Sequence, residues 1–165
     1  MLGDGTVIVA PGLTDAELAG TEAEFGFEFD DDHRAFLAAG LPVGDSWPDW
    51  RDAPRRALQQ RLALPAEGIL FAVEWRGFWF DGWGARPARM KDALRSARYH
   101  LERVPQLVPV HANCYLPAGR GSQGNPVLSV YQADVKCCGA DLLGYVEGRD
   151  GAAEKTVPFW SELIS

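Results

Sequence analysis

The chain has 165 residues, of which 47% are hydrophobic and 24% charged, as in an ordinary globular protein, and its formal net charge is −7. A chain of this length buries enough surface to fold without staples, so we expect one domain over residues 1–165. The acidic field repels phosphate backbones, which argues against nucleic acid as a ligand and favours a basic protein partner.

Features that would direct the chain out of the cytoplasm are missing from its sequence. The start "MLGDGTVIVAPG" has no Lys or Arg before a short apolar run, unlike a secretory signal. The longest other apolar run, Ile69 to Val73, is far shorter than a membrane span of about 20 residues. The three Cys, an odd number with Cys137 next to Cys138, predict free thiols. We therefore expect a cytoplasmic protein that does not enter a membrane.

The first half of the sequence predicts helices. Thr14 and Glu17 have the spacing of a capping box, which predicts a helix over 15–25. The acidic residues Asp30 to Asp32 suit the start of a second helix, which Gly40 ends before Pro42. Three further segments are predicted downstream: a short helix over 52–62, a helical turn at 64–73 that leads toward a strand, and a long helix between Pro87 and Pro105.

The long helix between Pro87 and Pro105 carries many basic residues. Its outer face is predicted to hold Arg86, Arg89, Lys91, Arg95, Arg98 and Arg103. Exposed aromatic residues do not alternate with them, and Asp92 and Glu102 offset their charge, so we interpret this face as solvated rather than as a phosphate-binding stripe.

The second half of the sequence predicts strands. Three segments, 107–117, 126–132 and 134–138, are separated by a glycine-rich loop and a tight turn, and this spacing is typical of a three-stranded meander. Helical turns are expected again at 139–148 and after Pro158. The predicted fold is α+β, a mostly antiparallel sheet with helices packed against it.

Few residues offer catalytic chemistry. His111, Cys114, Cys137 and Cys138 together supply four nitrogen and sulfur atoms that zinc prefers. Adjacent residues of a strand face opposite sides, so Cys137 and Cys138 should not converge, and His111 and Cys114 should face apart if they share one strand. We therefore predict no metal, no cofactor and no catalytic residue, and keep a thiol or metal enzyme centred on His111 and Cys114 as the weakest alternative.

Two aromatic segments have different predicted roles. In "GFWFDGWG", aromatic enrichment and the flanking glycine predict a strand over 77–80. Its Phe78, Trp79 and Phe80 are expected in the core, because large aromatic side chains are mostly buried. The loop "SWPDW" is the candidate partner-binding surface. Its Trp47 and Trp50 stand among acidic residues, which suits recognition of a basic protein. The predicted partner-binding residues are Asp45, Trp47, Asp49 and Trp50.

The order of these motifs resembles the SUKH superfamily, a fold shared by a fungal cell-wall assembly regulator and many bacterial immunity proteins. The resemblance rests on "LTDAELAGTEAEFGFEF", "EGILFAVEWRGFWFDGWGARP", "VPQLVPVHANCYLP", "NPVLSVYQADVKCCGADL" and "PFWSEL", and it covers nearly the whole chain. It implies a non-enzymatic α+β protein that neutralises a cognate toxin, often a nuclease or deaminase, by forming a complex. The alternative is a regulatory or scaffold module without a toxin partner.

The chain departs from the usual SUKH pattern in one region. Similar proteins tend to read Pro-Val-Tyr-Gly-His-Arg-Tyr where this chain has Pro109 to Tyr115, and aromatic residues where it has Cys137 and Cys138. Both departures fall on strands predicted to be neighbours, so we interpret them as one repacked patch.

Overall fold

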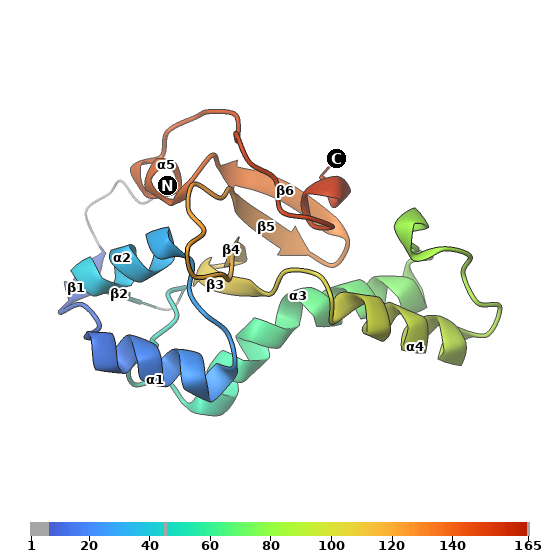
Figure 1. Ribbon diagram of the computed structural model, residues 1–165, viewed down its shortest axis with the longest axis horizontal. Helices are drawn as coiled ribbons and strands as arrows, with labels where there is room; N and C mark the ends of the chain where they lie inside the picture. Colours follow the sequence, from blue (N-terminus) through green and yellow to red (C-terminus); the bar gives the residue numbers. More distant parts are fainter. Residues whose placement is uncertain (1–6, 45, 165) are drawn as a thin grey trace.

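The computed structural model describes residues 7–44 and 46–164, and these residues form an α+β fold (Figure 1). The helices are α1 (Asp15–Phe25), α2 (Asp31–Ala39), α3 (Arg55–Trp75), α4 (Met90–Leu101) and α5 (Leu142–Glu147), with short 3-10 turns η1 (Asp81–Trp83) and η2 (Ser161–Leu163). The strands are β1 (Ile8–Ala10), β2 (Leu41–Val43), β3 (Leu107–His111), β4 (Cys114–Pro117), β5 (Val127–Tyr131) and β6 (Asp134–Gly139). The predicted fold class is confirmed.

The strands form two antiparallel sheets. One pairs β1 with β2, and the other is a meander in the order β3-β4-β5-β6. Figure 1 shows α3 and α4 side by side beneath the meander, with α1, α2 and the small sheet gathered at the opposite end from α4. Pro109 lies within β3, at one edge of the meander, and Ile164 forms a parallel bridge with Val135 of β6, at the other edge.

The helix starts at α1 and α2 follow the predicted capping. Thr14 accepts a hydrogen bond from the Glu17 backbone at 3.1 Å, and the Glu17 carboxylate accepts one from Thr14 at 3.0 Å. The Asp30 carboxylate accepts from the His33 backbone at 2.7 Å. Each contact satisfies a backbone donor that the helix leaves free.

Helix α3 is longer than predicted. It runs without interruption through Pro65, where the sequence suggested separate helical segments. Pro65 is buried in line with Leu62 one turn before it and Ile69 one turn after it. Continuous burial along this side offsets the hydrogen bond that a proline removes from a helix.

The predicted strand at residues 77–80 is wrong. This segment is a loop that leads into η1, and Phe78, Trp79 and Phe80 are only partly buried. The loop is held by side chains instead of by a strand partner: the Trp79 indole donates to the Gly84 carbonyl at 2.8 Å. The ring of Trp83, at the end of η1, stacks on Phe159 with a centroid distance of 5.6 Å.

The meander has four strands where three were predicted. A tight turn at Ala112 and Asn113 divides the segment 107–117 into β3 and β4, and Ala112 takes the left-handed backbone conformation with φ 50°. His111 and Cys114 therefore become a cross-strand pair. The expectation that they face apart on one strand is wrong, because it assumed an unbroken strand.

Candidate functional site

The predicted aromatic partner surface is not exposed. Trp50 is 2% exposed and packs edge-on against Phe29 at 5.4 Å between ring centroids. Trp47 is 8% exposed and lies 4.4 Å from the ring of His111. Both indoles are enclosed by elements distant in sequence, so the prediction of an exposed Trp surface is wrong. Asp45 lies outside the described residues.

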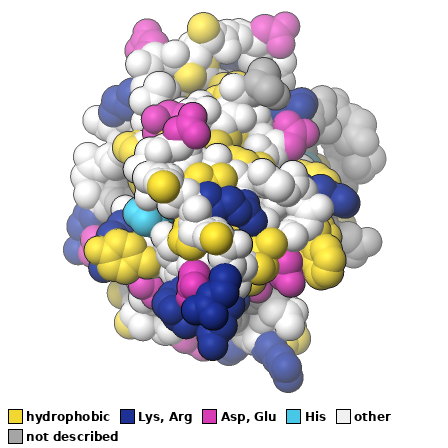
Figure 2. All heavy atoms as spheres, turned by 90° about the vertical axis from the view of Figure 1, so that its right-hand side faces the viewer, with side chains coloured by type: hydrophobic (Ala, Val, Ile, Leu, Met, Phe, Trp, Pro, Cys, Tyr) yellow, Lys and Arg dark blue, Asp and Glu magenta, His cyan; other side chains and the backbone are white. Residues whose placement is uncertain are grey.

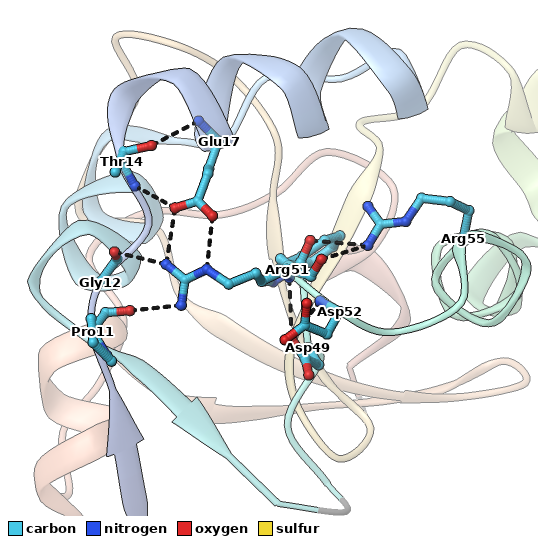
Figure 3. A network of polar contacts seen from close by, with 9 residues as sticks. Pro11, Gly12, Thr14, Glu17, Asp49, Arg51, Asp52 and Arg55 are labelled. Carbon is cyan, nitrogen blue, oxygen red and sulfur yellow. Dashed lines mark hydrogen bonds and ion pairs between the residues drawn. The ribbon is translucent and has the colours of Figure 1, made fainter.

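Asp49 has a structural contact in the same loop. Its carboxylate accepts hydrogen bonds from the backbone N–H groups of Arg51 at 3.1 Å and Asp52 at 2.9 Å. These bonds fix a tight turn just before α3. The turn also presents the guanidinium of Arg51 to the start of α1 (Figure 3).

The Arg51 guanidinium connects two parts of the chain. It donates to Glu17 at 2.7 and 2.9 Å, and to the carbonyls of Pro11 and Gly12 at 3.0 Å each (Figure 3). The hydrogen bond from Arg51, helped by the backbone of Thr14, lowers the pKa of Glu17 from 4.5 to about 2. The segment 49–51 is therefore a clamp that holds α1.

The acidic residues at the start of α2 are also structural. Asp30 is fully buried and accepts from the Asn125 side chain at 3.1 Å. Asp31 accepts from the Gly121 backbone at 2.8 Å, and Asp32 from that of Gly124 at 2.7 Å. The three carboxylates hold the glycine-rich loop against α2, which the sequence alone did not indicate.

The basic side chains near α4 lie on a mixed surface. Figure 2 shows this end of the molecule, where Lys and Arg side chains gather low in the view among acidic and hydrophobic ones. Asp92 pairs with Arg89 and Arg95, each at 3.2 Å. Arg86, predicted on this outer face, instead turns inward and donates to the Phe78 carbonyl at 3.0 Å. The contacts are those of a solvated helix face.

A cluster of polar side chains lies where β3, β4, β6 and α5 meet. Nδ1 of His111 is 2.8 Å from the Tyr145 hydroxyl, and Sγ of Cys114 is 3.1 Å from Sγ of Cys138. Cys137 is exposed, and its thiol contacts the Gly139 carbonyl at 3.4 Å, so the two neighbouring thiols diverge as expected. The pairing of β5 with β6 shifts register between Val127 and Leu128, which lie opposite this part of β6.

The surroundings of the cluster set its protonation. Burial lowers the pKa of His111, and the nearby Arg61 lowers it further, which favours the neutral ring. Burial also raises the pKa of the Tyr145 hydroxyl, which therefore keeps its proton. Within residues 7–44 and 46–164, no three or more His, Cys, Asp or Glu side chains are grouped as metal ligands.

An apolar groove between α3 and the β5–β6 turn was missed by sequence reasoning. It has a volume of about 430 Å³, and among the described residues that line it Leu64, Phe71, Val130 and Tyr131 are apolar or aromatic and Glu67 is charged. Leu64 is 56% exposed and Tyr131 66% exposed. Gly68 lets the helix approach the turn, since a Cβ there would lie 3.1 Å from the backbone of Gln132.

The groove is part of a larger apolar face of α3. Leu64, Phe71 and Trp75 lie off the buried side of α3, so the helix has more apolar surface than its packing uses. Trp75 is 64% exposed beyond the end of the groove. Large apolar side chains that gather on an exposed face are typical of an interaction surface.

Comparisons with family models, curated proteins and solved structures found no match to this chain. The resemblance to the SUKH superfamily therefore stays a prediction. None of the helices in the described part of the chain is both long and apolar enough to cross a membrane.

Proposed function

We propose that this chain is a cytoplasmic protein-binding domain whose binding surface is the outer face of α3. The groove between Leu64, Phe71 and Tyr131 is the observation that carries the proposal. Burying such side chains against a partner removes apolar area from water at roughly 25 cal/mol per Å². A few anchor residues, tyrosine prominent among them, supply most of the affinity of protein interfaces, and Tyr131 is the anchor of this kind in the groove.

The charge around the groove favours a basic partner. Glu67 lines the groove, and Glu74 lies two turns further along the same helix. Neither carboxylate joins an ion pair with another described residue. The guanidinium of Arg76, 5.5 Å from the centre of the Phe71 ring, offsets one of these two charges. Glu67, Glu74 and Arg76 together still leave a net negative charge beside the apolar contact, which favours a basic partner and speeds its association.

The particular function we propose is immunity to a toxin. The motif order resembles the SUKH superfamily, whose bacterial members bind toxin domains, and nuclease toxins need basic surfaces to hold their substrates. Masking such a surface requires only a tight complex and no bond-making step. The alternative remains a regulatory or scaffold module that binds a harmless partner through the same face.

The proposal is tested by capturing partners from source cells with the wild-type chain and with a Leu64→Gln, Tyr131→Ser double variant. Leu143→Gln is the matched control, because Leu143 is 59% exposed on α5. Each captured chain is then produced alone and together with each form of this protein. We expect a chain that is toxic alone, neutralised at equimolar amounts by the wild type and the control, and bound at least tenfold more weakly by the double variant.

Different outcomes separate the two functions. A harmless partner whose binding needs Leu64 and Tyr131 would support the regulatory module and overturn the immunity function. Protection by far less than one equivalent would show catalysis and overturn both. Equal binding by the wild type and the double variant would place the interface away from α3.

A further inference from the structure

The cysteine pair Cys114 and Cys138 has a geometry that the binding function does not use. Cys114 is buried on β4, and Cys138 is half-buried on β6, so solvent reaches the second thiol more readily. Their sulfur atoms lie 3.1 Å apart, and a disulfide needs about 2.05 Å. The sulfur atoms are thus about 1 Å further apart than in a disulfide, and closing that gap would link β4 to β6 across β5, which lies between them.

We propose that Cys114 and Cys138 form a peroxide-sensitive dithiol, in which Cys138 reacts first and Cys114 closes the disulfide. This inference rests on the sulfur geometry and is independent of the proposed binding function.

The reaction balances with a hydroperoxide as oxidant. The Cys138 thiolate attacks one peroxide oxygen, the O–O bond breaks, and the leaving oxygen departs as an alcohol or water after taking a proton, which leaves a sulfenic acid on Cys138. The Cys114 sulfur then attacks the Cys138 sulfur, and the S–O bond breaks. The hydroxide leaves with the Cys114 proton as water. Two thiols have lost two electrons and two protons, and the peroxide has gained them.

The surroundings assign these two roles to the two thiols. The hydrogen bond from Cys114 lowers the pKa of Cys138, and Ser129 adds to this lowering, so Cys138 is the better thiolate. The same contact and burial raise the pKa of Cys114, which stays protonated until attack. The neutral Tyr145 hydroxyl contacts the Cys114 thiol and also lies 2.8 Å from Nδ1 of His111, and the charged group near His111 is the Arg61 guanidinium.

Exposed Cys137 is the competitor that the experiment must separate. The full chain is reduced, freed of reductant, treated with one equivalent of hydrogen peroxide, alkylated under denaturing conditions and analysed by mass spectrometry. We expect one alkyl group on the oxidised chain where the reduced chain takes three, a further loss of about 2 Da for the disulfide, a Cys114–Cys138 cross-link in the peptide map, and full reversal by dithiothreitol. The Cys137→Ser variant should give the same cross-link.

Two variants test the order of the steps. Cys114→Ala should abolish the cross-link and leave a sulfenic acid on Cys138 that dimedone traps. It should also move the midpoint of the pH profile for Cys138 alkylation up by at least about one pH unit, because the hydrogen bond that favours the thiolate is gone. Cys138→Ser should abolish the cross-link without a trapped sulfenic acid on Cys114.

Three results would overturn the inference. The first is a cross-link through Cys137, whether within one chain or between two chains. The second is that all three thiols can still be alkylated after peroxide treatment. The third is a sulfenic acid that forms first on Cys114. Circular dichroism of each variant checks its fold. If Cys114→Ala does not fold, the inference is still tested by the peptide map of Cys137→Ser and by the loss of the cross-link in Cys138→Ser.

Discussion

The buried histidine of α2 makes stability depend on pH in a direction that can be worked out. His33 is 1% exposed, its ring lies 4.9 Å from Phe29, and its Nδ1 is buried without a hydrogen-bond partner. Burial lowers the pKa of His33 from 6.5 to about 3, because the charged ring would lose its water. The folded protein therefore keeps this ring neutral at a pH where the unfolded chain protonates it.

The magnitude follows from linkage. Below pH 6.5 the unfolded state binds one more proton than the folded state, so the free energy of unfolding falls by about 1.4 kcal/mol per pH unit. Integrated from pH 7 to pH 5, the loss due to His33 is about 2 kcal/mol. A His33→Phe variant keeps a ring against Phe29 and removes the proton site, so it should lack this loss.

The assay is urea unfolding followed by tryptophan fluorescence at pH 7, 6 and 5, for the wild type and the variant. The difference between their pH profiles isolates His33, because Asp30 and His111 are present in both proteins. We expect the variant to be at least as stable at pH 7 and to gain about 2 kcal/mol over the wild type by pH 5. Parallel profiles, or a His33 ring that titrates near pH 6.5 by NMR in the folded protein, would refute the reasoning.

The Arg51 clamp and the tryptophans give two more expected results. The charged Glu17 carboxylate stabilises the fold above its unfolded pKa of 4.5, and this stability is lost as the pH falls toward its folded pKa of about 2. Across that pH window, the melting temperature of the wild type should therefore drop more steeply than the melting temperature of Glu17→Gln. A drop of equal steepness in circular dichroism melts would show that the clamp does not depend on this charge. Trp50→Ala should cost about 3–5 kcal/mol by urea unfolding, because the indole fills a closed aromatic cluster, while Trp75→Ala should cost under about 1 kcal/mol. Equal costs would contradict the burial difference between the two residues.

Local signals in the sequence predicted local structure well. The capping box of Thr14 and Glu17 and the acidic start of α2 depend on residues three apart, and such contacts form whatever surrounds them. The turn at Ala112 and Asn113 was missed because its left-handed position is an alanine, where Gly or Asn is usual, and the Asn stands one residue later. The interpretation of His111 and Cys114 failed as a direct consequence.

Burial was harder to predict than helix starts. "SWPDW" has a loop composition, and nothing within it shows that three phenylalanine side chains from 25–29 would enclose Trp50. The segment 64–73 was predicted as a helical turn that leads toward a strand, and only the packed fold separates its buried Ile69 from its exposed Phe71. The groove depends on contacts between α3 and a turn some 65 residues later in the chain, which no local pattern encodes.

The edges of the β3–β6 sheet affect how copies of this protein behave toward one another. An open edge strand is a template on which another chain can add its own strand, and this is a common start of aggregation. Pro109 takes one N–H group out of β3, and on β6 the bridge between Ile164 and Val135 occupies part of the outer edge beside the charged side chain of Lys136. Strand addition is thus hindered at both ends of the meander, so contacts made through side chains on α3 need not compete with sheet extension between copies.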